Sequence, residues 1–151
     1  MQRGLGDLDE LYQDVLLDHY RNPRRTRRLE SPDAEVDAIN PFCGDEIHLQ
    51  LLMGDGRVSK ISVTGQGCSI SQAAGSLLAE IVDGKTPDEA RELRELFRGL
   101  MTGEELTDEQ ADRLEDNLAL QGVRRFPVRI KCALLSWSAL SDALDEVAAT
   151  G

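Results

Sequence analysis

The chain has 151 residues, which suits one domain large enough to bury an ordinary core without disulfides. Its 28 acidic residues outnumber its 17 basic residues, so a formal net charge of -11 argues against a general affinity for nucleic acid or anionic membrane and favours a partner with a basic patch. Three cysteines far apart in the sequence do not make a disulfide framework and fit a reducing, cytoplasmic setting.

The first thirty residues predict a helix followed by a basic segment. The start is acidic and amphipathic, and no apolar run is long enough to span a membrane, so we expect neither a signal peptide nor a transmembrane helix. A helix is predicted from Asp7, its candidate N-cap, to Tyr20, with one apolar face made by Leu8, Leu11, Tyr12, Val15, Leu16 and His19. Residues 21–28 then carry five arginines, which either meet a partner or, as we favour, form a solvated linker.

The next segment predicts an antiparallel sheet. Residues 35–39 suit a short strand, and residues 47–53 alternate so that Ile47, Leu49, Leu51 and Met53 share one face. Gly54-Asp55-Gly56 predicts a hairpin turn, after which residues 58–64 return as a third strand with Ile61 and Val63 on the covered face.

The rest of the chain predicts helices. A helix follows Gly65-Gln66-Gly67-Cys68, with Ser69 or Ser71 as its cap and Gly84 at its end. We expect the two glycines to let the backbone approach a metal closely. The segment also resembles a phosphate loop, but it lacks the Gly-Lys-Ser/Thr ending of one, so we favour the metal. Two charged helices are predicted over residues 86–100 and 107–120, and we expect them to serve as structure or as a partner surface. The second has the spacing of a capping box at Thr107–Gln110. A long helix is predicted from Pro127, with Trp137 in the core.

Cysteines and one carboxylate define a candidate metal site. Cys43 and Asp45 flank Gly44 on a short loop, Cys68 lies at a helix start, and Cys132 is expected in the first turn of the last helix, where free N–H groups favour a thiolate. Zinc accepts thiolate and carboxylate together. Isolated cysteines are also commonly buried as small hydrophobes, so these residues alone leave a metal-free interaction domain open.

Several motifs together resemble one known family. They are Leu11-Tyr12, Asp18-His19-Tyr20, Asn22-Pro23, Asn40-Pro41-Phe42-Cys43-Gly44-Asp45, Gly65-Gln66-Gly67-Cys68-Ser69-Ile70-Ser71, Lys131-Cys132-Ala133 and Trp137. In this order they resemble the IscU/NifU-type iron–sulfur cluster assembly family and, within it, the SufU branch. Lys131 stands where IscU-type scaffolds carry histidine, and residues 125–129 replace their chaperone-docking Leu-Pro-Pro-Val-Lys. The charged segment around residues 99–121 resembles the helical insertion of the SufU branch within a single domain over residues 1–151.

The resemblance implies an α+β fold, a three-stranded antiparallel sheet covered by helices. It also implies zinc bound by Cys43, Asp45, Cys68 and Cys132. Proteins of the SufU branch accept persulfide sulfur from a SufS-type cysteine desulfurase, a pyridoxal-phosphate enzyme, and pass it to downstream Suf cluster-assembly proteins. The partner inserts a histidine on the zinc in place of one thiolate.

Two roles remain open at this stage. In the first, the protein is a zinc-dependent sulfurtransferase in which Cys43, on the glycine-hinged loop, accepts sulfur and Arg129 helps to keep the released thiolate ionised. In the second, the same ligands hold a [2Fe–2S] cluster that is assembled on the protein as a scaffold.

Overall fold

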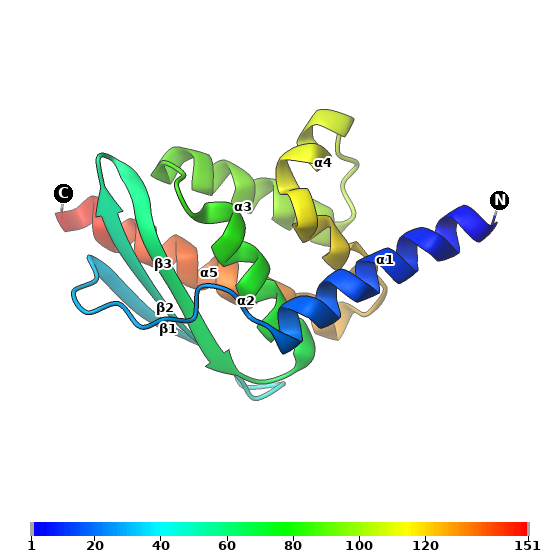
Figure 1. The fold of residues 1–151 in the computed structure, drawn as a ribbon, viewed down its shortest axis with the longest axis horizontal. Coiled ribbons are helices and arrows are strands. Elements are labelled where there is room, and N and C mark those ends of the chain that lie inside the picture. Colours follow the sequence, from blue (N-terminus) through cyan, green and yellow to red (C-terminus); the bar gives the residue numbers. More distant parts are fainter. Residues whose placement is uncertain (1, 151) are drawn as a thin grey trace.

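The computed structural model describes the backbone of residues 2–150 and the side chains of residues 12–149. Its elements, in chain order, are α1 (Gln2–Arg21), β1 (Ala34–Asn40), β2 (Asp45–Gly54), β3 (Arg57–Gln66), α2 (Ser69–Val82), α3 (Pro87–Thr102), α4 (Asp108–Leu114), the 3₁₀ helix η1 (Glu115–Arg125) and α5 (Pro127–Thr150). The strands form one antiparallel sheet in the order β1-β2-β3. Helices α2 and α5 cover one face of this sheet (Figure 1). The predicted α+β architecture is therefore confirmed.

The alternating pattern of residues 47–53 positions β2 as the central strand. Leu49 pairs with Val63 and Leu51 with Ile61, and these four side chains are all buried on the helix-covered face. The register shifts between Leu52 and Met53, so Met53 is only partly buried. Asp55 and Gly56 both have positive φ, at 53° and 73°, which is the backbone of a two-residue hairpin turn that matches the twist of the strands.

The arginine-rich segment after α1 is partly fastened to the fold. Arg24 forms an ion pair with Asp18 at 2.6 Å, and Arg25 pairs with Glu80 at 3.3 Å. The Arg25 carbonyl also accepts a hydrogen bond from the Val63 backbone N–H at 2.9 Å, beside the outer edge of β3. This part of the basic run therefore holds the linker against α2 and β3, in contrast to the solvated linker that we favoured from the sequence.

Two predicted helix boundaries are wrong. Helix α1 begins at Gln2, so Asp7 lies inside it and is not its N-cap; the predicted contacts of Leu8 and Leu11 lie outside the described side chains. The predicted helix from residue 107 to 120 ends at Leu114, because Glu115 has a φ of +50° that an α-helix cannot continue through, and η1 follows. The capping box predicted at Thr107 is confirmed. A second capping box, which was not predicted, begins α3 at Thr86.

Helix α5 carries much of the core, as predicted. Trp137 is 1% exposed, and its ring stacks on Phe97 of α3 with centroids 5.3 Å apart. Leu140 and Leu144 continue the same buried stripe.

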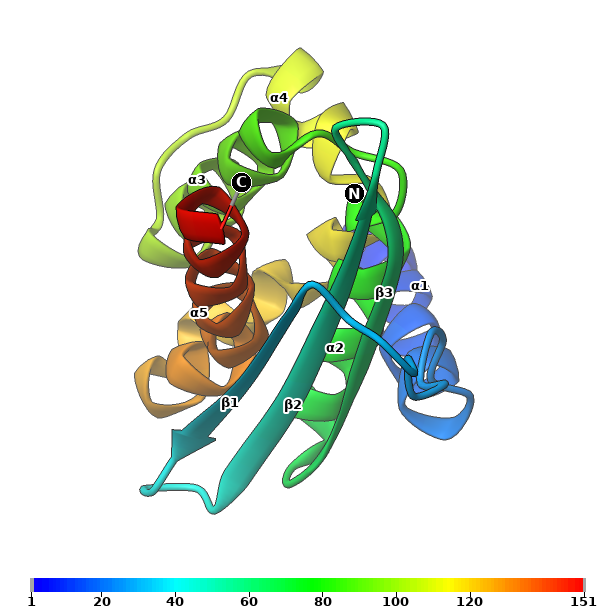
Figure 2. The same ribbon diagram turned by 90° about the vertical axis from the view of Figure 1, so that its left-hand side faces the viewer.

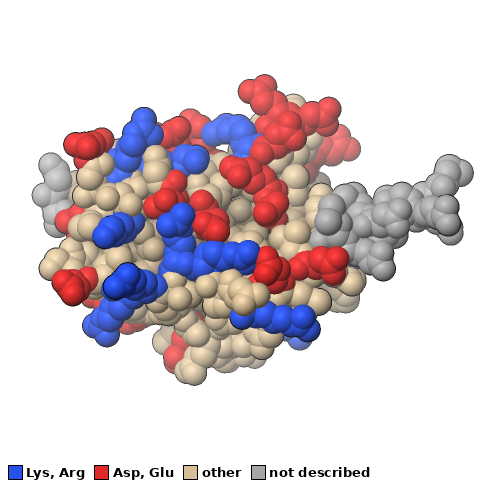
Figure 3. Space-filling view, in the orientation of Figure 1, with Lys and Arg blue, Asp and Glu red and all other residues tan. Residues whose placement is uncertain are grey.

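Figure 3 shows acidic side chains gathered over α4, at the upper right of the molecule. Among the described residues, every helix is too short or too polar to cross a bilayer.

Candidate metal centre

Three segments that are distant in the sequence meet at one end of the sheet. They are the β1–β2 loop, the turn from β3 to α2, and the N-terminal part of α5, which Figure 2 shows near the bottom of the sheet. Ligand atoms of Cys43, Asp45 and Cys132 lie within 4.8 Å of one another. The Sγ atoms of Cys43 and Cys132 are 3.3 Å apart, and Cys68 Sγ lies 4.0 Å from Asp45 Oδ2. The structure thus brings together three of the four predicted ligands and places the fourth beside Asp45.

Asp45 is the central residue of this arrangement. It is the first residue of β2 and is fully buried. Its Oδ1 accepts hydrogen bonds from the Cys68 backbone N–H at 2.9 Å and from Ser71 Oγ at 3.2 Å. Its other oxygen, Oδ2, faces the Cys68 sulfur. Oδ1 of Asp45 therefore joins the start of β2 to the turn from β3 to α2, and Oδ2 faces the Cys68 thiol.

Two glycines allow the turn after β3 to pack directly on β2. A Cβ at Gly67 would lie 2.2 Å from Asp45 Oδ1, and a Cβ at Gly65 would lie 2.0 Å from the Glu46 carbonyl oxygen. No side chain tolerates contacts this short. The groups that approach these glycines are therefore the β2 backbone and the Asp45 carboxylate. That the glycines also let the backbone approach a metal stays a prediction.

Cys68 is itself the N-cap of α2, so the prediction that Ser69 or Ser71 caps this helix is wrong. Its φ and ψ of -73° and 165° are extended, as expected for an N-cap, and its backbone N–H is taken by Asp45. The Ser71 hydroxyl lies 3.0 Å from the Cys68 carbonyl oxygen and 3.2 Å from Asp45 Oδ1, so it holds the turn rather than capping the helix. The predicted position of the Cys68 thiol at a helix N-terminus is confirmed.

Cys132 differs from its predicted environment. It is the sixth residue of α5, beyond the four N–H groups that are free at a helix start, so it is not in the first turn. It is fully buried, and burial, followed by hydrogen bonding with Asp45, Cys43 and Cys68, raises the pKa of its thiol. The expectation that the helix start favours a thiolate here is wrong, because the dipole acts within the first turn and burial acts in the opposite direction.

Cys43 comes from the loop of the site, and like Cys68 it is only partly buried. It is half-buried on the β1–β2 loop, and the following residue, Gly44, has a φ of +70° with no described atom within 4 Å of the position of a Cβ. Asn40 fastens the start of this loop: its carbonyl oxygen accepts from the Cys43 N–H at 3.3 Å, and its Oδ1 accepts from the Phe42 N–H at 3.3 Å. The sequence analysis missed this role, although an Asn before Pro is a common turn signal.

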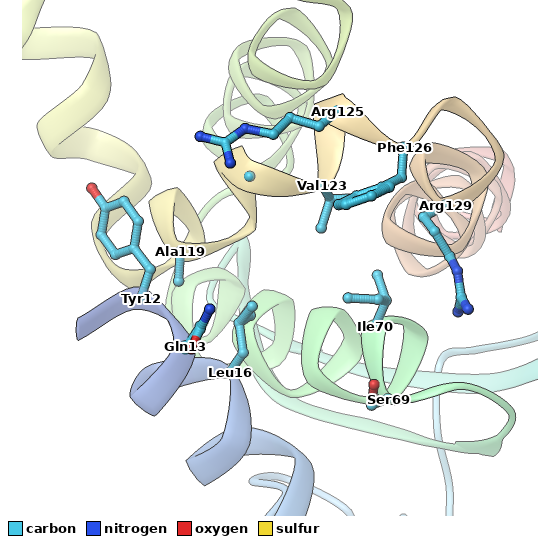
Figure 4. A pocket seen from close by; sticks show the side chains of 11 residues that line it. Tyr12, Gln13, Leu16, Ser69, Ile70, Ala119, Val123, Arg125, Phe126 and Arg129 are labelled. Atoms are coloured by element: carbon cyan, nitrogen blue, oxygen red, sulfur yellow. The ribbon is translucent and has the colours of Figure 1, made fainter. Parts of the chain in front are cut away.

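Two basic residues of α5, Arg129 and Lys131, lie near the site, and within the described residues neither forms a hydrogen bond with a thiol. Lys131 places its Nζ over the ring of Phe42, 4.9 Å from the centroid. Arg129 is exposed and lines a groove between α1, α2 and η1 (Figure 4), and within the described part of the chain no hydrogen bond joins its guanidinium to a thiol. Both histidines are bonded away from the site, His19 to Ser76 at 2.7 Å and His48 to Glu35 at 2.7 Å. The donors that this chain brings to the site are therefore sulfur and oxygen.

The donor set fits a zinc ion. Tetrahedral zinc with bonds of about 2.3 Å to sulfur and about 2.0 Å to oxygen separates two sulfurs by about 3.8 Å and a sulfur from an oxygen by about 3.5 Å. The Cys43–Cys132 and Cys68–Asp45 separations of 3.3 Å and 4.0 Å differ from these values by about 0.5 Å each, which small side-chain rotations can supply. Cys43, Asp45 and Cys132 could thus supply three corners of one tetrahedron. Cys68 lies outside this group, 4.0 Å from Asp45 Oδ2, and its sulfur would have to move toward the other two thiols to supply the fourth.

Known proteins show the same fold and similar sequences. A family model described as the NifU-like N-terminal domain matches residues 11–133. The zinc-dependent sulfurtransferase SufU of Bacillus subtilis is 43% identical over 89% of this chain and 89% of its own length. The iron–sulfur cluster assembly scaffold protein IscU of Streptococcus pyogenes is 36% identical over 93% of this chain and 86% of its own length. A crystal structure described as a scaffold protein of the SUF system from Fervidobacterium islandicum superposes with a TM-score of 0.80 at 29% identity, covering 86% of this chain and 93% of that one.

Proposed function

Because the chain belongs to the family of NifU-like N-terminal domains, we propose that it is a zinc-dependent sulfurtransferase that accepts persulfide sulfur for iron–sulfur cluster assembly. The observation that carries the proposal is the convergence of Cys43, Asp45 and Cys132, with Cys68 beside Asp45, at one end of the sheet. Similarity to a protein named a zinc-dependent sulfurtransferase supports it.

Cys43 is the proposed sulfur acceptor. Its thiol is half-buried on a loop with open space around Gly44, whereas Cys132 is fully buried and Cys68 begins a helix. The Cys43 thiolate attacks the terminal sulfur of the donor persulfide, a new S–S bond forms, and the donor's S–S bond breaks with its electron pair leaving on the donor thiolate. Zinc, when bound, supplies a positive charge that keeps its cysteine ligands deprotonated.

Arg129 is proposed to assist this transfer as a nearby cation. It lies one turn before Cys132 on α5, and its side chain is exposed to an incoming partner. A cation beside a released Cys43 would favour the thiolate. The chemistry needs free thiols throughout, and all three cysteines are unpaired here, so we place the protein in the reducing cytoplasm.

A partner is needed to deliver sulfur, and the surface beside the site suits one. Four apolar side chains around the site are unusually exposed, namely Ile39 at 62%, Phe42 at 82%, Phe126 at 61% and Val128 at 68%. Exposed apolar side chains next to a site are a common feature of docking surfaces. We propose that a SufS-type cysteine desulfurase docks here and that downstream Suf cluster-assembly proteins receive the sulfur. The desulfurase could add a histidine to the zinc, since the described site has none of its own.

A scaffold role is the second candidate. The same three thiols and carboxylate can hold a [2Fe–2S] cluster, and the relative from Streptococcus pyogenes is named an assembly scaffold. Metal analysis after anaerobic purification separates the two roles. About one zinc per chain without visible absorbance supports the sulfurtransferase, whereas iron with inorganic sulfide supports the scaffold.

The acceptor is tested by locating the transferred sulfur. The protein is incubated with a cysteine desulfurase and cysteine, and the persulfide is then mapped by peptide mass. We expect it on Cys43, and Cys43→Ala should abolish transfer while keeping the fold. Cys68→Ala and Cys132→Ala should lose both zinc and transfer, since these thiols are held inside the site. Persulfide found mainly on Cys68 or Cys132 would overturn the assignment.

A further inference from the structure

A groove beside the metal centre has apolar walls. It lies between α1, the first turn of α2, η1 and the start of α5, and has a volume of about 580 Å³. Its apolar walls come from Leu16, Ile70, Val123 and Phe126, and Arg125 and Arg129 also line it. Ile70 and Val123 point into the space between α2 and η1 in Figure 4. We call this feature the α1–η1 groove.

The charge of the α1–η1 groove is opposite to that of the whole chain. Of the described residues that line it, Arg125 and Arg129 are charged and none is acidic. Neither guanidinium forms an ion pair within the described part of the chain, although the protein carries a net charge of -11. A second hollow of about 280 Å³ has the opposite character, since Glu80, Glu115 and Asp116 line it. Among the described residues, this pair of unpaired arginines is therefore a local property of the α1–η1 groove.

The apolar surface continues past the groove along α1. A smaller hollow of about 260 Å³ shares Leu16 and Ile70 with the groove and extends it to Leu17 and Tyr20. These two side chains are 44% and 46% exposed, so they offer further apolar surface to an occupant. A small molecule would fill the groove alone, whereas a peptide segment could also cover this extension.

We infer that the α1–η1 groove binds an acidic, apolar peptide segment of the partner protein that delivers sulfur. Apolar side chains of the segment would lie on Ile70 and Phe126, and its carboxylates would meet Arg125 and Arg129, because Arg binds carboxylates with two parallel hydrogen bonds. The inference rests on the proposed function for the identity of the partner.

The position of the groove explains why such a segment would help transfer. Ser69, which lines the groove, directly follows Cys68 of the metal centre. A segment bound there tethers the partner beside Cys43 and raises the effective concentration of its persulfide. Binding in the groove would therefore govern how much protein is needed for transfer, whereas the thiols would govern the maximal rate.

The first test uses Arg125→Glu, with Arg124→Glu as the matched control. Both arginines are exposed neighbours at the end of η1, but only Arg125 lines the groove. In assays with a purified cysteine desulfurase, Arg125→Glu should raise the half-saturating concentration of this protein about tenfold, with the maximal rate unchanged. Arg124→Glu should have little effect. Equal effects of the two variants, or a lower maximal rate at unchanged half-saturation, would overturn the inference.

The second test does not depend on the sulfurtransferase role. A fluorescein-labelled peptide of alternating leucine, phenylalanine and glutamate is titrated by anisotropy, and a peptide with lysine in place of glutamate is its control. We expect the glutamate peptide to bind more tightly, to lose affinity in Arg125→Glu but not in Arg124→Glu, and to shift the amide signals of Ile70 and Val123. Absence of binding would overturn the inference even if sulfur transfer is observed. Failure to stimulate the desulfurase, with peptide binding intact, would instead refute the proposed function.

Two other occupants are outcomes of the same experiments. N-acetylphenylalanine that binds as tightly as the peptide would assign the groove to a small acid and overturn the peptide assignment. If sedimentation shows that the protein is a dimer and that the Arg125→Glu variant is a monomer, the groove belongs to a second copy of this chain. That result would also overturn the peptide assignment. Phe126→Ala provides an independent variant of the apolar wall, since this side chain is 61% exposed and its loss should leave the fold intact.

Discussion

Replacing Gly67 with alanine tests whether the close packing of the turn after β3 builds the metal centre. Gly67 has a φ of +143°, a backbone conformation that is almost confined to glycine. An added Cβ would lie 2.2 Å from Asp45 Oδ1 and 2.9 Å from Asp45 Cα. Because Asp45 is fully buried at the start of β2, either it or the turn must move.

The cost can be worked from the contacts that this movement breaks. Backbone strain at such a position costs about 1–3 kcal/mol. Displacing Asp45 also breaks its hydrogen bonds from the Cys68 N–H and Ser71 Oγ, and an unsatisfied buried polar group costs about 1–3 kcal/mol. We therefore expect Gly67→Ala to lower the free energy of unfolding by about 2–6 kcal/mol, or the melting temperature by about 5–20 °C. Zinc affinity should fall as well, because Asp45 is a proposed ligand.

Gly44→Ala is the matched control, because it adds strain without a collision. Gly44 has a φ of +70°, and no described atom lies within 4 Å of an added Cβ. Its cost should be the left-handed strain alone, about 1–2 kcal/mol. Thermal unfolding of the metal-free variants by circular dichroism and zinc competition with a chromophoric chelator measure both effects. A melting temperature for Gly67→Ala as high as that of Gly44→Ala would refute the reasoning.

Three further predictions concern the metal, the thiols and pH. Removing zinc with a chelator should lower the melting temperature markedly, since its ligands come from three separate segments and structural zinc adds directly to folding energy; an unchanged melting curve would contradict this. Oxidation of the metal-free protein with diamide should join Cys43 to Cys132, whose sulfurs are 3.3 Å apart, and peptide mapping that finds Cys68 in the disulfide instead would refute it. Hydrogen bonding to Asp37 raises the pKa of His48. The stability that the protonated His48 contributes is therefore fully present below the unfolded pKa of about 6.5 and is lost as the pH rises through the higher folded pKa. His48→Asn should therefore lower the melting temperature slightly in acid and not in alkali, and the reverse trend would exclude this account.

Local patterns predicted the parts of the fold that depend on neighbouring residues. The alternation of residues 47–53 and the Asp55-Gly56 turn place β2 and β3 correctly, because strand period and turn geometry are both local. The Thr107–Gln110 capping box is correct for the same reason, since its two hydrogen bonds join residues three apart. Trp137 is buried as predicted because α5 has one continuous apolar stripe.

The rest of the site depends on contacts between distant segments, which no local pattern records. The depth of Cys132 follows from how α5 packs on the sheet and on the loop that carries Cys43. The need for Gly67 comes from Asp45, which lies on another strand. Asn40 Nδ2 lies 3.9 Å from Cys132 Sγ, a contact between β1 and α5 that no local pattern records. Sequence motifs therefore predicted the candidate ligands, whereas the structure was needed to explain how these residues are held.

The stack between Trp137 and Phe97 gives the molecule a built-in optical reporter. Trp137 is the only tryptophan in the chain, so intrinsic fluorescence comes from one known position on α5. Its ring is 1% exposed and stacks on α3, so its emission should be blue-shifted and should respond when these two helices separate. Cys132 lies five residues earlier on the same helix. Stopped-flow measurement of Trp137 emission can thus follow the packing of α5 on α3 when zinc is added to the metal-free protein. It needs no added dye and no substitution.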